Sequence, residues 1–240
     1  MEQSLRPSQK RIWELDALRG VCILFVIVIH ILFDLVYFLN LPISFPPVYT
    51  FIQNNGGIIF IVLSGICVTL GSKSLRRGVI VFSCGLLITL VTYFMPVLHL
   101  AGREIVVWFG ILHLLGACMI LYPLFRSWPI AVKAAVGAAL IVAGYCFLQV
   151  FVKTPYLFVL GLRTEGFTSG DYFPILPYLG WFLLGTVLGG TLYKDRKSKL
   201  PQVNSHNPAL RFFQFCGRQS LWIYLLHQPL VYGILTLITA

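Results

Sequence analysis

Apolar segments about as long as a bilayer-crossing helix follow one another along almost the whole chain of 240 residues. A helix needs roughly 20 residues to cross the hydrocarbon core of a membrane. Prolines such as Pro42, Pro96 and Pro129 interrupt the apolar pattern between segments. The sequence therefore predicts an all-α, polytopic membrane bundle of about seven transmembrane helices. The expected spans are residues 17–39, 48–71, 77–96, 105–126, 129–151, 173–193 and 212–238.

The composition supports a membrane protein and leaves little room for anything else. Hydrophobic residues make up 58% of the chain and charged residues only 11%, whereas a soluble domain carries about 25% charged residues. A separate soluble domain would need a stretch of ordinary polar composition, and the spans leave no such stretch. We therefore expect residues 1–240 to form a single transmembrane domain.

Basic residues are distributed unevenly between the two predicted faces of the bundle. With a cytoplasmic N-terminus, twelve of them fall on the cytoplasmic face, and only Arg103, Lys153 and Arg163 fall on the other. The positive-inside rule then predicts that the N-terminus is cytoplasmic. The net charge of +10 indicates orientation and contact with membrane lipids, and nucleic-acid binding is excluded because no folded basic domain is present. The twelve residues are Arg6, Lys10, Arg11, Lys73, Arg76, Arg77, Arg126, Lys194, Arg196, Lys197, Lys199 and Arg211.

Polar side chains inside the apolar spans give the strongest functional signal. Such groups are costly in hydrocarbon, so they normally face a bundle interior or a wet cavity. His30 and Asp34 are spaced i,i+4 and share one face of the first span. By their depth in the spans, most of these residues belong to the outer half of the bundle. The sequence predicts one polar chamber there, lined by His30, Asp34, Gln53, Asn54, His113, Tyr224, His227 and Gln228.

Other interpretations of these residues remain open. A transporter or channel for a small polar solute would use the same chamber without covalent chemistry. In a purely structural membrane protein, the polar side chains would only join helices by hydrogen bonds. Gly185 and Gly189 have the spacing of a helix-packing motif. No tight metal-ligand spacing occurs, and the six cysteines form no Cys-x-x-Cys pair, so no metal is expected.

Four segments carry a resemblance to a known family. "RIWELDALRGVCILFVIVIHILFDL", "FGILHLLG", "PYLGWFLLGTVLGG" and "GRQSLWIYLLHQP" resemble, in order, blocks of the heparan-α-glucosaminide N-acetyltransferase family, in particular its small bacterial branch. Members take an acyl group from cytoplasmic acyl-CoA and pass it to a sugar across the membrane. The resemblance implies acetyl-CoA (acyl-CoA) as the donor, a glycan or amino-sugar acceptor, a multi-pass location in the bacterial inner membrane and, as often in the family, a homo-oligomer.

One departure from the family pattern leaves the catalytic residue open. Members carry an Asn at the end of the first span and a catalytic His in the following loop. Here His30 stands at the Asn position, and no His is present near Leu41. The candidates for the base or acyl carrier are therefore His30, His113 and His227, because neutral imidazole performs either task near pH 7. We expect His30 to do so, with Asp34 orienting its ring.

The remaining roles follow from the chemistry of acyl transfer from coenzyme A. Asn54, Gln228 or Tyr224 would stabilise the developing oxyanion, and Gln53 is a further residue for acceptor binding. The phosphates of coenzyme A require cations, for which Arg218, Arg19 and the loop 73–77 are the candidates. The thin pantetheine arm would lie along the small-residue stripe from Gly57 to Gly65, which includes Ser64.

Overall fold

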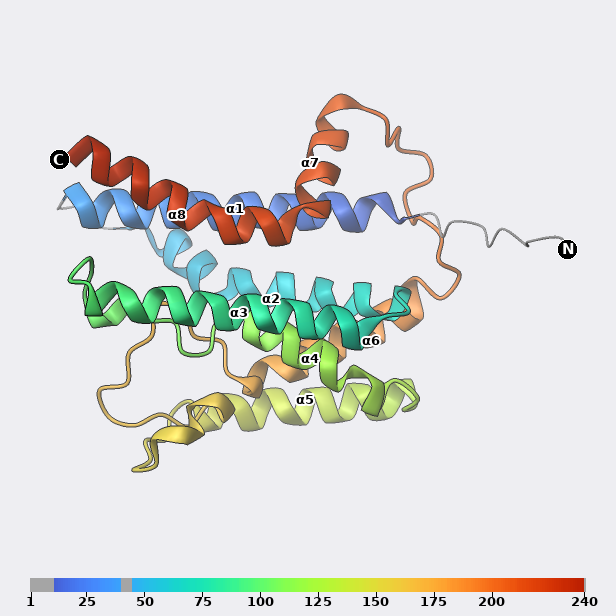
Figure 1. Cartoon of the computed structure of the whole chain (residues 1–240). Coiled ribbons are helices and arrows are strands. Elements are labelled where there is room, and N and C mark those ends of the chain that lie inside the picture. Colours follow the sequence, from blue (N-terminus) through green and yellow to red (C-terminus); the bar gives the residue numbers. More distant parts are fainter. Residues whose placement is uncertain (1–10, 40–44, 240) are drawn as a thin grey trace, which may run out of the picture.

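The computed structural model describes residues 11–39 and 45–239, and this part of the chain contains helices and no strand (Figure 1). The α-helices are α1 (Trp13–Leu39), α2 (Pro47–Leu70), α3 (Ser74–Val97), α4 (Ile111–Phe125), α5 (Ile130–Phe147), α6 (Ile175–Leu192), α7 (Pro208–Arg218) and α8 (Ser220–Thr239). Two short 3-10 helices, η1 (Arg103–Ile105) and η2 (Pro155–Leu160), lie in the connections. The predicted all-α bundle is confirmed.

Five of these helices are long and apolar enough to cross a membrane: α1 over Trp13–Val36, and α2, α3, α5 and α6 over their whole lengths. Their starts agree with local sequence signals, since Pro46, Pro129 and Pro174 directly precede α2, α5 and α6. Proline suits a helix start because the first amides of a helix have no partner within it. The number of seven spans and the cytoplasmic N-terminus stay predictions.

Two predicted spans differ from the observed helices. The fourth was expected at 105–126, but α4 begins only at Ile111. The preceding segment pairs instead with the loop before α6: Gly170 N donates to Val106 O at 3.0 Å, and Phe173 N donates to Phe109 O at 2.9 Å. These bonds fix residues 106–109 in an extended form that a helix could not provide.

The seventh predicted span, 212–238, is divided into α7 and α8 at Gln219. α7 starts at a well-formed cap, where the Asn207 side chain accepts a hydrogen bond from Ala209 N at 2.9 Å. It runs across the direction of α1 and α8 (Figure 1). The long apolar span of the sequence is therefore two helices, of which α8 follows the bundle direction and α7 does not.

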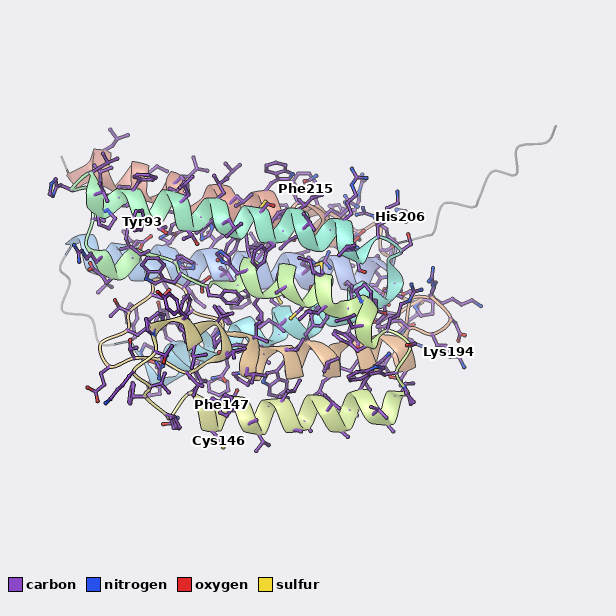
Figure 2. All side chains as sticks on the ribbon, turned by 60° about the horizontal axis from the view of Figure 1, so that its bottom comes forward. Tyr93, Cys146, Phe147, Lys194, His206 and Phe215 are labelled. Carbon is purple, nitrogen blue, oxygen red and sulfur yellow. The ribbon has the colours of Figure 1, made fainter. Side chains whose placement is uncertain are left out.

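The helices pack in two groups. One contains α2 to α6, in which α2 and α5 pack on α6 and α3 packs on α4; the other contains α1, α7 and α8, and the contacts between the groups are fewer. Lys194 and His206 lie at one end of the bundle and Tyr93 toward the other (Figure 2). We call the first end the arginine end, because the arginines that line the pocket described below gather there.

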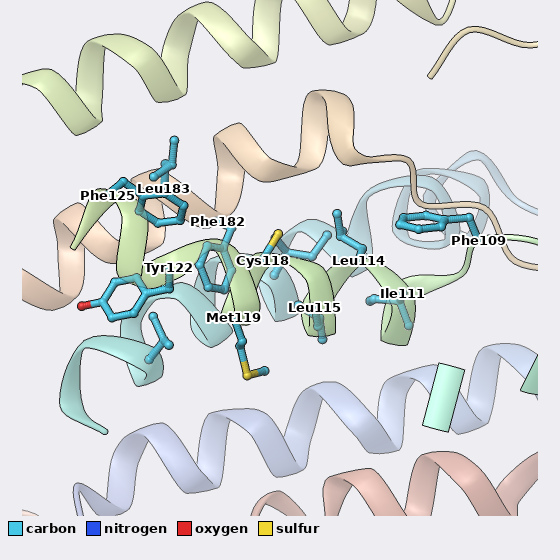
Figure 3. Packing of buried hydrophobic residues seen from close by; sticks show 12 residues of the cluster. Phe109, Ile111, Leu114, Leu115, Cys118, Met119, Tyr122, Phe125, Phe182 and Leu183 are labelled. Atoms are coloured by element: carbon cyan, nitrogen blue, oxygen red, sulfur yellow. The ribbon is translucent and has the colours of Figure 1, made fainter. Parts of the chain in front are cut away.

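α4 is the centre of the hydrophobic core. Its residues Leu114, Leu115 and Cys118 are almost fully buried, together with Phe182 and Leu183 of α6 (Figure 3). A helix that is apolar on all sides is normally surrounded by other elements, and α4 agrees with that rule. It is also the helix whose first turn faces the candidate site.

Glycines allow the closest helix crossings. A side chain at Gly65 of α2 would overlap the Phe182 carbonyl and approach the Gly185 backbone of α6, and Gly189 meets Ile66 and Thr69. The prediction that Gly185 and Gly189 serve helix packing is confirmed, and they pack within one chain. In the second group, Gly20 of α1 and Gly217 of α7 approach so closely that a side chain on either would overlap the backbone of the other helix.

Candidate active site

A pocket of about 470 Å³ at the arginine end is lined mainly by guanidinium groups. They come from the start of α1, from α3, from the loop after α6 and from the last residue of α7: Arg11, Arg19, Arg77, Arg196 and Arg218. Among the described residues, Asp16 is the only carboxylate in the lining, and Arg11 and Arg19 each lie 3.9 Å from it. The pocket therefore carries a strong excess of positive charge, which suits a ligand with several phosphates.

A narrower cavity of about 240 Å³ continues from this pocket into the bundle. Arg19, Cys67, Arg77 and Arg218 line both spaces, so the two join there. Successive turns of three helices then form its wall: Ile23 and Val26 of α1, Ser64 and Phe60 of α2, and Leu221 and Tyr224 of α8. We call this cavity the channel; it is mostly apolar and reaches Tyr224 and Ile111, the first residue of α4.

The structure corrects the predicted path of the pantetheine arm. Ser64 lines the channel as expected, but Gly65 faces α6 and is covered by it, and Gly57 lies against the Phe173 ring. The two glycines of the stripe are thus covered by side-chain and helix packing, and a ligand in the channel would pass Ser64 but not Gly57 or Gly65. A small residue in a membrane helix allows another helix to approach as readily as it allows a ligand, so the sequence could not distinguish these uses.

Polar side chains of α1 and α8 meet beyond the end of the channel that lies away from the arginine pocket. The His30 and His227 rings are 5.0 Å apart between centroids. Gln228 Nε2 donates to Asp34 Oδ2 at 3.0 Å, and the Tyr224 ring lies 5.3 Å from the His227 ring. We call His30, Asp34, His227 and Gln228 the histidine cluster. The structure therefore brings together five of the predicted residues, counting Tyr224, although Asp34 bonds Gln228 rather than the expected His30.

The hydrogen bonds of His227 fix its tautomer. Its Nδ1 lies 2.6 Å from the Tyr224 carbonyl oxygen, and because a carbonyl can only accept, Nδ1 carries the proton. The lone pair is then on Nε2, which is buried and has no hydrogen-bond partner among the described residues. The Gln228 Oε1 atom, from the next residue of α8, is in the same situation. Two neighbouring residues of α8 thus each carry an unpartnered acceptor atom, which could accept a hydrogen bond from a hydroxyl or amine group.

His113 lies apart from the cluster, and both its nitrogens are engaged. The Gly110 amide donates to its Nδ1 at 3.2 Å, and its Nε2 lies 3.2 Å from Thr89 Oγ1, which itself donates to the Val107 carbonyl at 2.6 Å. The ring is 2% exposed and packs against Phe109 and Phe82. This side chain caps the start of α4 and joins it to α3, so it has no lone pair left for a substrate.

Asp171 is a member of the site that sequence reasoning missed. Its Oδ2 accepts hydrogen bonds from Ile111 N at 2.9 Å and from the Tyr224 hydroxyl at 3.2 Å. Burial raises the pKa of the Asp171 carboxyl, while these two hydrogen bonds oppose the rise. A carboxylate at a helix start is favoured by the helix dipole. Asp171 thus joins the first turn of α4 to the tyrosine at the end of the channel.

The remaining predicted residues are not shown to join the histidine cluster. Gln53 is exposed on α2 and forms no hydrogen bond with the rest of the described chain. The Asn54 side chain and Leu41 lie outside what the structure describes. No group of three or more His, Cys, Asp or Glu residues that would suit a metal ion occurs in residues 11–39 and 45–239, and the six cysteines are free.

A match to a known protein family covers most of the chain. The family model of the catalytic domain of heparan-α-glucosaminide N-acetyltransferase matches residues 11–229. The chain belongs to this family. Neither a curated protein nor a solved structure matches the chain.

Membership of the heparan-α-glucosaminide N-acetyltransferase family supports a membrane acetyltransferase-type function. Together with the five apolar helices, it indicates an integral membrane protein. The matched region contains α1 to α7 and α8 as far as Pro229. It therefore includes the arginine pocket, the channel and the histidine cluster.

Proposed function

We propose that this chain transfers an acyl group, in the first place acetyl, from acyl-CoA bound at the arginine end to a sugar hydroxyl or amine that enters from the opposite end. The observation that carries the proposal is the continuity of the arginine pocket with the apolar channel, which ends beside the histidine cluster. A charged nucleotide, a thin pantetheine arm and a reactive thioester follow one another in acyl-CoA in the same order.

The dimensions of the site support this arrangement. Arg19 and His30 are eleven positions apart on α1, which corresponds to about 16 Å along a helix. The pantetheine arm is nearly as long as half of the hydrocarbon core, about 15 Å. With its phosphates against Arg19, Arg77 and Arg218, acyl-CoA would therefore place its thioester near Tyr224 and His227.

The hydrogen bonds favour His227 over His30 as the base. The Tyr224 carbonyl orients its ring, and Nε2 is the nitrogen that would accept the proton of the acceptor O–H or N–H group. The acceptor atom then bonds to the thioester carbon, the C–S bond breaks, and the departing sulfur of coenzyme A takes the proton back from His227. His30, whose ring faces His227, remains the rival for this role, and Asp34 remains a candidate for stabilising positive charge there.

The other polar groups of the cluster supply acceptor binding and oxyanion stabilisation in this proposal. The oxyanion would be stabilised by the Tyr224 hydroxyl, which would leave Asp171 to do so, or by the second N–H of the Gln228 amide, whose first N–H donates to Asp34. The unpartnered Gln228 Oε1 would accept a proton from a sugar hydroxyl or amine. Gln53 and Asn54 extend the predicted acceptor site along α2.

The proposal includes the sidedness and the membrane. The twelve-to-three distribution of basic residues supports a cytoplasmic arginine end, and the resemblance to the small bacterial branch supports a location in the inner membrane. The acceptor is then a glycan or amino sugar at the outer face. A homo-oligomer is the expected assembly.

The experiment is transfer in proteoliposomes with radiolabelled acetyl-CoA supplied on one side and an amino-sugar or glycan acceptor on the other. We expect acetylated acceptor only when acetyl-CoA is present at the arginine end, whose sidedness is established by labelling cysteines introduced into loops 73–77 and 153–172. Binding of acetyl-CoA to the purified protein is measured in parallel. Absence of binding would overturn the proposal, and solute uptake without acyl-CoA binding would establish the transporter alternative.

A further inference from the structure

α7 presents an aromatic face outward at the arginine end. Phe212 and Phe215 are each 54% exposed and lie one turn apart, so they share one side of the helix. Phe215 projects from the outer side of the bundle (Figure 2). An 11-residue helix with one apolar side, lying across the bundle, has the form of a helix that rests in the plane of a membrane interface.

The opposite side of α7 is fixed to α1. Cys216 and Gly217 are buried, and a side chain at Gly217 would overlap the Asp16 carbonyl. In the same half of the helix, Gln214 Nε2 donates to the Ser205 carbonyl at 2.9 Å, which ties the preceding loop to α7. α7 therefore cannot roll to bury its phenylalanines against the bundle, and their exposure is a property of the folded chain.

The charge around this aromatic face is strongly positive. Residues 194–218 contain six cationic side chains and a single carboxylate, Asp195. Lys194, Lys197, Lys199 and Arg211 are exposed and lie outside the arginine pocket. Arg211 directly precedes Phe212, so a charge and an aromatic ring are presented together. Basic residues beside an amphipathic helix favour anionic phospholipid headgroups, and the aromatic rings favour the boundary between headgroups and acyl chains.

We propose that α7 and the basic loop 194–199 form a binding surface for anionic phospholipid, with Phe212 and Phe215 inserted between the headgroups and Arg211, Lys197 and Lys199 paired with their phosphates. α7 is then an interfacial helix and not the beginning of a membrane span. The side chains assigned to lipid, Lys197, Lys199, Arg211, Phe212 and Phe215, do not line the arginine pocket or the channel, and the inference holds whatever reaction the chain performs.

The test is photo-crosslinking of the full chain in nanodiscs of mixed phosphatidylcholine and phosphatidylglycerol. A Phe215→p-benzoylphenylalanine variant should form lipid adducts, identified by mass spectrometry, whereas the same replacement of the exposed loop residue Gln202 should form few. The fraction of phosphatidylglycerol among the Phe215 adducts should exceed its fraction in the bilayer severalfold, because each basic side chain near an anionic surface favours it by roughly fivefold. Thermal melting and gel filtration show that each variant is folded.

The charge is tested by combining Arg211→Gln with Lys197→Gln in the crosslinking variant. We expect the phosphatidylglycerol enrichment to fall toward the bilayer composition. Arg126→Gln, which removes an exposed basic residue at the end of α4 and outside α7 and loop 194–199, should leave it unchanged. Equal yields of lipid adducts at Phe215 and Gln202 would overturn the proposal. So would Phe215 adducts without phosphatidylglycerol enrichment when the basic residues are all present. Protein–protein adducts in place of lipid adducts would also overturn it and would identify α7 as a contact between copies.

Discussion

The arginine pocket and the histidine cluster differ in which of their polar groups lack a partner within the protein. At the arginine end, five guanidinium groups surround one carboxylate, and the positive charge exceeds what the protein itself neutralises. In the histidine cluster, the atoms without partners are acceptors, His227 Nε2 and Gln228 Oε1, and no Lys or Arg belongs to it. The first region thus suits anionic groups because of its charge, and the second offers acceptor atoms for protons, in agreement with the roles proposed for them.

This difference predicts how each region responds to a single substitution. Five guanidinium groups share the pocket, so the loss of one leaves four, and the effect is a graded loss of affinity. In the proposed mechanism the cluster depends on one ring held by one carbonyl, so we expect the loss of that ring to have the larger effect. The predictions below follow this contrast from the largest effect to the smallest.

The largest effect is expected for His227→Ala. Removal of a general base lowers turnover by roughly 10²–10⁴-fold, while acyl-CoA binding should stay unchanged because the arginine pocket lies at the other end of the channel. Single-turnover transfer and binding are measured on the same preparation. If His227→Ala remains active and His30→Ala is inactive, the base is His30; if both remain active, the proposed mechanism is wrong.

A graded effect is expected for Arg77→Ala. Loss of one charge-assisted contact costs about 1.5–3 kcal/mol, or roughly a tenfold to hundredfold rise in the Kd for acyl-CoA. Arg76→Ala is the matched control, because Arg76 is the preceding residue of α3, is exposed and does not line the pocket. Arg218→Ala should resemble Arg77→Ala. The Kd is measured by isothermal titration calorimetry. Equal values for Arg76→Ala and Arg77→Ala would show that the phosphates of acyl-CoA do not bind in this pocket.

The third prediction separates His113 from the cluster. His113→Ala leaves the Gly110 amide without its partner, at about 1–3 kcal/mol for an unsatisfied buried group, and it removes the contact of the ring with Thr89. We therefore expect a lower Tm, with transfer activity retained at temperatures where the variant is folded. His206→Ala, in an exposed loop, is the control for Tm. A folded but inactive His113→Ala would return this residue to the list of candidate bases.

The smallest effect concerns Asp171, which lies between the channel and α4. Because its pKa is raised in the folded state, the native protein holds this proton to a higher pH than the unfolded chain. Its contribution to stability is complete below the unfolded pKa of about 4 and is lost as the pH rises through the folded pKa. Asp171→Asn keeps an acceptor oxygen and should flatten the dependence of Tm on pH above about 4. Identical pH profiles for the variant and the native chain would show that Asp171 is not responsible.

The sequence predicted the arginine end better than the histidine end, for a physical reason. Charge near helix ends is visible in the sequence, and Arg19, Arg218 and Ser64 meet at one cavity as expected. Hydrogen-bond partners depend on helix rotation, so the i,i+4 spacing of His30 and Asp34 suggested a bond that Asp34 instead forms with Gln228. Asp171 was missed because it lies in a polar loop, although a carboxylate three positions before Pro174 at a helix start was a usable signal.

The fold was likewise predicted in part, for reasons that differ from one element to another. Apolar length predicted the bundle, but it could not separate α7 from α8, since their apolar residues form one run. Asn207 followed by Pro208 is a helix-start signal, and Arg218 inside the supposed span was a sign of the break. The late start of α4 had no comparable signal, because it results from pairing with a loop more than fifty residues later in the chain.

The crossing of Gly20 with Gly217 has a consequence for how such a chain varies through its history. Each glycine is the sequence neighbour of a pocket residue, Arg19 or Arg218, and any side chain at the crossing would push α7 away from α1. A lineage could therefore exchange single arginines and adjust its ligand preference gradually, whereas a change at either glycine would displace two cations at once. We therefore expect Gly20 and Gly217 to vary less among related chains than the arginines that they position.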